Sequence, residues 1–489
     1  MARRSTLCLI SSVTATVLAV VWTRAERLVG HDGFYYLKYA KQYTESWPEQ
    51  FGTHWPHGYP FVASFFAEIG LSAYWGLITI SVLSIVVTAW LTTFLIPTQI
   101  RSHWSTTALF AGFGAAPVAP LLLKTPLTDW LFTALVAGAI VLLRYWPRPW
   151  ALWGSAFAVV SAFCVRYAGI FLLGVIGLYG LWVLYSTEKR RTHLHTTLSI
   201  LMAGGVIVAL MGLNLYQTGH VGGAPRSSGG GVAALPIHAA HLGWAFIGGL
   251  SSPNVAGVVG GVESPVGIAI GYAVLGFVLA LCVRAFLREQ YVQLLRPAAL
   301  VVGSYLVCII ILRSISSFND LSQPRFILPV LLPAGALVIS QARGKFKSAV
   351  GVLAIGVVVV GLFAAGRGIS KEVYGNVDTA QRALSGELAP EDTILVNGRA
   401  LRLSAYFENT FRWRRASSLD GLDEALGEVQ AVDYAVFAAQ REGRFGEGGY
   451  QELSRPYRTI CLRADSLESI ERVVMDETVC VIRTKNTDM

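Results

Sequence analysis

The sequence predicts a multi-pass α-helical membrane protein of about eleven transmembrane helices, followed by a small extracytoplasmic α/β domain. Of its 489 residues, 54% are hydrophobic and only 14% are charged, whereas a soluble domain carries about 25% charged residues. The mean hydropathy is +0.53, and the charged and mixed sequence is concentrated beyond about residue 370. We therefore expect a transmembrane domain over 1–368 and a soluble domain over 369–489, which is long enough to form its own core.

The first part of the chain is a series of apolar runs, each near the ~20 residues that a helix needs to cross a bilayer. The first run has no clear cleavage site after it, so we expect it to remain as a span rather than to be removed as a signal peptide. Residues 58–70 fit either an interfacial helix or the start of the second span, and 235–251 fit a re-entrant or interfacial segment. The predicted spans are 6–24, 71–96, 104–123, 127–146, 150–165, 168–186, 197–214, 264–283, 298–315, 325–342 and 348–366.

The positions of lysine and arginine predict the orientation. Short cationic clusters stand before the first span and after the second, fourth, sixth, eighth and tenth. In an eleven-span arrangement all of them fall on the side of the N-terminus, and cytoplasmic loops are the ones enriched in Lys and Arg. We therefore expect a plasma (inner) membrane protein with a cytoplasmic N-terminus and an extracytoplasmic C-terminal domain. The net charge of +9 is explained by these clusters and does not predict a nucleic-acid partner.

The C-terminal segment shows the pattern of a small α/β unit. Strand-like runs occur at 393–396, 433–438 and 479–482, and 399–407 is helix-like. Strands that alternate with helical stretches favour an α/β sandwich. Of the six cysteines, Cys461 and Cys480 lie here, on the predicted oxidising side. They are either free or joined in a disulfide, and the sequence leaves this open.

Four segments on the predicted outer side carry residues suited to chemistry. The first contains Asp32, an acidic residue just beyond the first span that has no structural duty visible in the sequence. Charges at membrane boundaries suggest function by default, and the alternative is a solvated loop carboxylate. The four segments are His31-Asp32-Gly33-Phe34-Tyr35-Tyr36, Trp55-Pro56-His57-Gly58-Tyr59-Pro60, Lys124-Thr125-Pro126-Leu127-Thr128-Asp129 and Gln323-Pro324-Arg325-Phe326-Ile327-Leu328-Pro329.

These segments, in this order and on this side, resemble the C-class of integral-membrane glycosyltransferases, the superfamily of the protein O-mannosyltransferases and the lipid A aminoarabinose transferases. The second segment is similar to the family's Pro-Pro-x-Tyr-Pro stretch, and the fourth to its Arg-Tyr-x-x-Pro. The resemblance covers residues 1–366 and implies a GT-C-like fold. It also implies an enzyme that moves a sugar from a polyprenyl-phosphate carrier, on the outer face, to a lipid, glycan or protein acceptor.

The sequence departs from this family where paired acids often follow the first span. Here the pair is His31-Asp32, and the nearest further acids are Glu45 and Glu49. This departure disfavours a carboxylate-pair metal site and favours a metal-independent mechanism. No third ligand stands at useful spacing from the loop histidines to form a zinc site. We therefore expect no cofactor, with a divalent metal as the alternative that the sequence does not support.

Direct displacement at an anomeric carbon needs a carboxylate to take the acceptor's proton and cations to meet the departing phosphate. Asp32 suits the role of base in an inverting reaction. Arg325 is the first candidate for the phosphate because guanidinium offers a planar fork to phosphate oxygens; the alternative is a lipid-headgroup contact. Arg166 stands between two apolar runs, where a charge at mid-helix costs about 2.5–3.5 kcal/mol, so it must face a polar cavity or the outer surface.

Six further residues are candidates for binding phosphate, sugar or acceptor: His54, His57, Lys124, Asp129, Tyr35 and Tyr59. Each has a structural alternative. The histidines are then ordinary loop residues, the lysine and the aspartate form a structural ion pair or a helix cap, and the tyrosines anchor the chain at the membrane interface.

Two other classes of function compete with the transferase. A transporter or lipid flippase is disfavoured because no inverted repeat stands out and the mid-membrane spans are poor in acids and in broken helices. A structural or sensor protein would depend on residues 370–489 and would tolerate substitution of Asp32.

Overall fold

A computed structural model of the chain describes most of its helices and strands. The described residues are 2–22, 31–45, 56–101, 103–116, 119, 122–123, 127–146, 148–186, 190–222, 230–250, 261–287, 292–316, 321–342, 344–366, 380, 383–384, 387–389, 391–396, 412–416, 422–438, 455–467, 469–475 and 479–484. The chain forms two compact units. The first comprises Met1–Ala25 with Tyr35–Arg367, and the second Glu26–Phe34 with Gly368–Met489.

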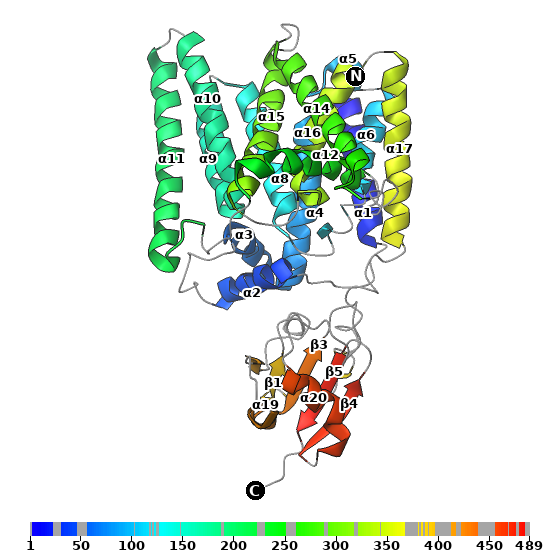
Figure 1. The fold of residues 1–489 in the computed structure, drawn as a ribbon. Coiled ribbons are helices and arrows are strands. Elements are labelled where there is room, and N and C mark those ends of the chain that lie inside the picture. The colour runs from blue at the N-terminus through cyan, green and yellow to red at the C-terminus, as the bar shows by residue number, and fades with distance from the viewer. Residues whose placement is uncertain are drawn as a thin grey trace. The chain divides into compact units, whose positions relative to one another are not determined.

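The described helices of the membrane part follow the apolar runs of the sequence closely (Figure 1). Most of each of the eleven predicted span ranges is helical. The α-helices are α1 Ala2–Trp22, α2 His31–Glu45, α3 Gly58–Ala67, α4 Ala73–Thr93, α5 Thr98–Arg101, α6 Trp104–Ala115, α8 Asp129–Arg144, α9 Pro149–Val165, α10 Ile170–Ser186, α11 Arg190–Thr218, α12 Leu235–Leu250, α14 Pro265–Leu287, α15 Val292–Ile315, α16 Leu328–Gln341 and α17 Lys345–Gly366. Short 3-10 turns lie between some of them: η1 Tyr167–Gly169, η2 Val232–Ala234 and η4 Pro324–Phe326.

The chain is a mostly helical, multi-pass membrane protein. Among the described residues, six helices are long and apolar enough to cross a membrane, and five shorter apolar helical segments accompany them. The six are Ala73–Thr93, Thr192–Thr218, Val232–Leu250, Pro265–Leu287, Leu295–Ile315 and Lys345–Leu362. The count of eleven spans stays a prediction, because several helices within the predicted ranges are shorter than a bilayer needs.

Two ambiguous segments of the sequence form helices of their own. The 58–70 segment contains α3, which a turn at Gly70 separates from α4; it is therefore not the start of the second span. The 235–251 segment contains α12, which Figure 1 shows lying across the bundle rather than along it. Helix α12 packs against α14, α15 and η4.

Helix α8 is surrounded by other helices of the membrane unit. It packs against α4, α9, α15 and α16, and 11 of its 16 residues are buried. A helix that is apolar nearly all round belongs inside a bundle. Its first residue, Asp129, and its last residue, Arg144, are charged, so each end of this buried helix brings a charge to one end of the bundle.

The second unit contains a five-stranded sheet in the order β2-β1-β3-β5-β4. Strand β1 runs parallel to β2 and β3, and β5 runs antiparallel to β3 and β4. The strands are β1 Thr393–Val396, β2 Arg412–Arg415, β3 Tyr434–Ala438, β4 Ile470–Met475 and β5 Val479–Thr484, and the accompanying helices are α19 Leu422–Gln430 and α20 Arg455–Arg463. The three predicted strands are present, while the predicted helix at 399–407 lies outside the described residues.

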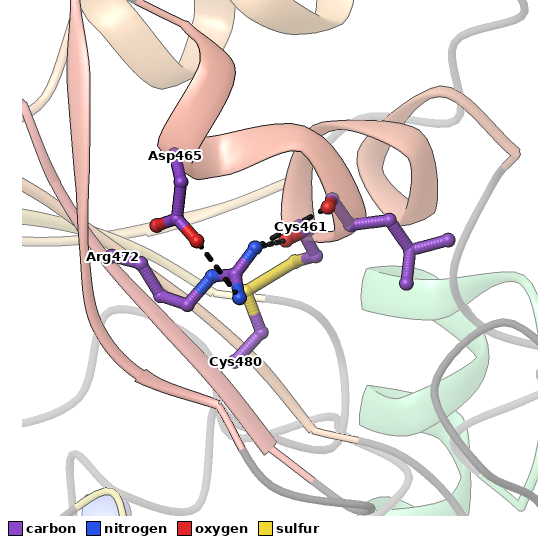
Figure 2. The surroundings of a disulfide bond; sticks show 5 residues. Cys461, Asp465, Arg472 and Cys480 are labelled. Atoms are coloured by element: carbon purple, nitrogen blue, oxygen red, sulfur yellow. Dashed lines mark hydrogen bonds and ion pairs between the residues drawn. A yellow bond between two sulfur atoms is a disulfide. The ribbon is translucent and has the colours of Figure 1, made fainter.

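Alternating residues of the strands form two apolar cores, one on each face of the sheet. Leu395, Phe437 and Ile482 face a core shared with α19 and α20, whereas Val396 and Val436 belong to the opposite core. The sequence left the pairing of Cys461 and Cys480 open, and in the structure they form a disulfide between α20 and β5 (Figure 2).

An arginine secures the end of α20 beside this disulfide (Figure 2). Arg472 Nη2 donates to the carbonyl oxygens of Cys461 and Leu462, both at 3.3 Å. Its Nη1 lies 3.1 Å from Asp465 Oδ2. Because the last carbonyls of a helix have no partner within the helix, Arg472 serves as their cap.

Candidate functional site

Asp129 is the first residue of α8, and two arginines, Arg166 and Arg325, lie close to its carboxylate. The residue is fully buried, and Thr133 Oγ1 donates to its backbone carbonyl at 2.6 Å. A carboxylate in the first turn of a helix is favoured by the partial positive charge of the helix N-terminus. That contribution alone does not offset the cost of burying a charge, so further positive partners are required.

Arg166 is the first of these partners and stands at a sharp corner of the chain. Helix α9 ends at Val165, Arg166 adopts an extended conformation, and η1 begins at the next residue. Gly169 allows this corner because a Cβ there would lie 2.5 Å from the carbonyl carbon of Ala162. The corner directs Arg166 Nη1 to Asp129 Oδ1, with which it forms a hydrogen-bonded ion pair.

Arg325 is the second partner and comes from the η4 turn before α16. Its Nε lies 3.8 Å from Asp129 Oδ1. The hydroxyl of Tyr305, on α15, donates to the Phe326 carbonyl at 2.6 Å and so fixes this turn. The two arginines therefore approach the same carboxylate oxygen from segments 159 positions apart in the sequence (325 − 166).

The cluster of Asp129, Arg166 and Arg325, here called the Asp129 cluster, brings two cations to one carboxylate oxygen. Two guanidiniums face one carboxylate, and arginine does not lose its charge in proteins. The side chain of Asp129 is 0% exposed, whereas those of Arg166 and Arg325 are 16% and 19% exposed. Both guanidinium carbons also lie 5.8 Å from the centre of the Phe326 ring. The arrangement suits an anion that approaches from the arginine side.

His57 belongs to an aromatic cluster next to the corner between α9 and η1 at which Arg166 stands. Tyr43 Oη lies 3.1 Å from His57 Nδ1, and the rings of Tyr39 and His57 are centred 4.5 Å apart. Burial lowers the pKa of His57 to about 4, so its imidazole is uncharged at neutral pH. At the adjoining Gly58 a Cβ would lie 2.8 Å from the carbonyl of Cys164, which brings α3 directly against the end of α9.

The two tyrosine candidates differ in their surroundings. Tyr59 is fully buried, and its hydroxyl donates to the Leu77 carbonyl at 2.9 Å and lies 3.0 Å from Ser81 Oγ. Its hydroxyl joins α3 to α4, and its contact with a sugar stays a prediction. Tyr35, on α2, is partly exposed and stays a candidate.

Three predicted site positions cannot be placed. His54 and Lys124 lie outside the described residues. Asp32 is the second residue of α2 and belongs to the second unit, but its side chain is not among those described. An ion pair between Lys124 and Asp129 stays a prediction, and among the described residues Asp129 pairs with Arg166 and Arg325.

Sequence reasoning missed two residues that shape this region, Tyr43 and Tyr305. Both are single tyrosines in helices, and no motif distinguishes them from other interfacial or core tyrosines. For metals, the described part of the chain contains no group of three or more His, Cys, Asp or Glu residues able to hold an ion.

Two solved structures of ArnT from Cupriavidus metallidurans are similar to this chain. The structure bound to undecaprenyl phosphate covers 98% of this chain and 98% of its own, with 14% identity and a TM-score of 0.58. The apo structure covers 99% of this chain and 98% of its own, with 14% identity and a TM-score of 0.56. No protein-family model and no curated protein matches the chain.

The structure therefore defines a multi-pass membrane protein with the fold of a C-class membrane glycosyltransferase. More particularly, the chain has the fold of ArnT over nearly its full length. The resemblance inferred from the sequence is confirmed at the level of the fold.

Proposed function

We propose that the protein is a glycosyltransferase that moves a hexosyl or pentosyl group from a polyprenyl-phosphate carrier to a lipid, glycan or protein acceptor. The observation that carries the proposal is the convergence of Arg166 and Arg325 on the buried Asp129. Partly exposed arginines suit a phosphate, which guanidinium binds through charge-assisted hydrogen bonds. The similar ArnT structure holds undecaprenyl phosphate, a ligand of the same chemistry.

In the proposed reaction Asp32 accepts the proton of the acceptor hydroxyl. The acceptor oxygen forms a bond to the anomeric carbon from the face opposite the phosphate, which inverts the configuration. The bond between that carbon and the phosphate oxygen breaks, and its electron pair stays on the phosphate oxygen. Arg325 and Arg166 stabilise the negative charge that develops there, and the carrier leaves as a polyprenyl phosphate.

The uncharged state of His57 changes its proposed role. A neutral imidazole adds no charge to a phosphate site, so we assign His57 to the packing of α2 against α3 beside the arginine corner. The contact of Gly58 with Cys164 supports this assignment. His54, Lys124 and Tyr35 stay candidates for contacts to phosphate, acceptor and sugar.

We further propose that the Asp129 cluster faces the extracytoplasmic side. The N-terminus and α5 lie at one end of the bundle and α3 at the other (Figure 1), and α3 is the helix that adjoins the arginine corner. The lysine and arginine clusters of the sequence favour a cytoplasmic N-terminus. The site then opens toward the outer leaflet.

A direct test uses the purified full-length protein in lipid nanodiscs. Polyprenyl-phosphate-linked hexose and pentose donors are supplied with a membrane extract as acceptor source, and the release of polyprenyl phosphate is followed by mass spectrometry. We expect release with at least one donor and a loss of about ten- to hundredfold in R325Q, the effect of removing one charge-assisted contact. Equal release by R325Q and the unsubstituted protein would contradict the assignment of Arg325.

A binding control separates the phosphate from the lipid tail. Undecaprenyl phosphate and undecaprenol differ only in the phosphate group, so the loss of affinity in R325Q should appear for the first ligand and be absent for the second.

A further inference from the structure

Asp129 lies where it can control both arginines at once. It is the fully buried member of the cluster, whereas the arginines are partly exposed. An anion that approaches from solvent therefore meets guanidinium groups before it meets the carboxylate. Asp129 therefore contacts the arginines from the buried side, away from the solvent-exposed part of the site.

The three residues of the Asp129 cluster lie in different kinds of secondary structure. Asp129 starts a 16-residue helix packed on several sides. Arg166 stands at a corner between a helix and a 3-10 turn, and Arg325 lies within a three-residue 3-10 turn. The backbone hydrogen bonds of short 3-10 segments have poorer geometry than those of α-helices. The ion pairs with Asp129 on α8 therefore help to fix the conformation of the two turns.

The charges also require a shared partner. Both arginines approach one oxygen atom, Asp129 Oδ1, so without the carboxylate two like charges would face each other in a largely buried place. Like charges in such surroundings repel strongly. The other oxygen, Oδ2, is buried and has no hydrogen-bond partner among the described residues.

We infer that Asp129 is a positioning residue, whose carboxylate holds the guanidiniums of Arg166 and Arg325 in the geometry that binds the carrier phosphate. This inference rests on the proposed function, because it takes the two arginines to be the phosphate ligands. Asp129 does not touch the carrier; it acts through the two arginines. Its removal is therefore expected to weaken binding although it makes the site more positive.

The test is a mutant cycle on the full-length protein, with undecaprenyl phosphate as the probe and its dissociation constant as the readout. D129N is measured in the unsubstituted protein and in the R166Q/R325Q background. Coupled residues show non-additive effects in such a cycle. We expect D129N to weaken binding about tenfold or more in the first case, and not to weaken it in the second, where no arginine is left to position.

Each outcome bears on a separate claim. Equal weakening by D129N in both backgrounds, or tighter binding by D129N alone, overturns the positioning role and leaves the arginine site intact. Unchanged binding by R166Q/R325Q overturns the proposed function itself. The expected pattern supports both.

Two further variants guard against a general loss of folding. D129E keeps the charge but lengthens the side chain, so a positioning role predicts weaker binding at unchanged net charge. T133V removes the buried hydroxyl one turn along α8, which bonds the Asp129 carbonyl, and should leave affinity within about twofold. Thermal unfolding of every variant is recorded beside its affinity; a D129E variant that binds like the unsubstituted protein also counts against the inference.

Discussion

The two ends of α8 each bring arginines together, but with different partners. At the end that begins with Asp129, Arg166 and Arg325 share a buried carboxylate. At the other end, Arg144 donates to the Phe94 carbonyl and Arg101 Nε to the Ile96 carbonyl at 2.9 Å. Burial and the neighbouring charge of Arg144 lower the pKa of Arg101, so these two arginines are also close enough to interact.

The two ends of α8 differ in the groups that the arginines bind, which are backbone carbonyls at one end and a carboxylate at the other. Phe94 is the C-cap of α4 and Ile96 lies two residues beyond it, in the turn that follows the helix; carbonyls at a helix end lack helical partners. Arg101 and Arg144 satisfy those carbonyls, and arginine near a helix C-terminus is also favoured by the helix dipole. The arginines of the Asp129 cluster instead require a buried charge from another helix. The identity of the partner, rather than the residue type, distinguishes a site from a cap.

The largest expected effect concerns the proposed base, Asp32, rather than either end of α8. In D32N the proposed base cannot accept a proton, and general-base catalysis typically contributes about 10²- to 10⁴-fold to the rate. We expect kcat for sugar transfer to fall by that factor while undecaprenyl phosphate still binds. Normal transfer by D32N, in protein that is normally expressed and inserted, would end the assignment of Asp32.

The second prediction extends the comparison to a fifth arginine, Arg472, which caps α20 beside the disulfide. The crosslink between Cys461 and Cys480 spans 19 positions, and closing a loop of this size stabilises a fold by about 3 kcal/mol. C461S should lower the stability of the C-terminal unit by roughly that amount, seen as faster limited proteolysis of the full chain. Reductant should reproduce the effect in the unsubstituted protein and in C282S, but not in C461S; equal proteolysis rates throughout would contradict it.

The third prediction contrasts the two ends of α8 directly. R166A should weaken undecaprenyl phosphate binding about ten- to hundredfold, the cost of one charge-assisted contact. R144A should leave that affinity unchanged and lower the free energy of unfolding by about 1–2 kcal/mol, because the Phe94 carbonyl loses its partner. Affinity and thermal midpoint are measured on the same preparations. A loss of affinity in R144A as large as that in R166A would remove the distinction between the two ends.

The smallest expected effect is the pH dependence that His57 adds beside the Asp129 end. Burial lowers the pKa of His57 from the ordinary 6.5 to about 4. Between these values the unfolded chain binds the proton and the folded chain does not, so stability falls as the pH drops from about 6.5 to about 4. H57Q should show a shallower fall in thermal midpoint over this window. Parallel curves for H57Q and the unsubstituted protein would contradict the burial of an uncharged His57.

The sequence predicted the helical bundle well because apolar runs of bilayer length are a strong and local signal. It also singled out Arg166, since a charge between two apolar runs needs a polar partner. The strands β1, β3 and β5 are apolar and were predicted. The edge strand β2, Arg412–Arg415, was not, because its three arginines lack the alternation that marks a half-buried strand.

The ion pairs of Asp129 with Arg166 and Arg325 could not be predicted from the sequence. Asp129 stands five positions from Lys124 along the chain, and the sequence offered a local ion pair between these two residues as one alternative. Its partners in the structure come from the α9 corner and from η4, and only the packing of α8 against α9 and α16 brings them together. The burial of Tyr59 was missed for a similar reason, because an aromatic residue in a Pro-rich loop motif does not reveal whether α4 covers it.

Helix α8 is fastened at both of its ends. Its 16 residues extend about 24 Å at 1.5 Å per residue, from the Asp129 ion pairs to the bond between Arg144 and Phe94. Sliding α8 along its axis would break contacts at both termini together. If the proposed carrier binds at the Asp129 end, its exchange is therefore expected to move the two turns that carry Arg166 and Arg325, while α8 stays in place.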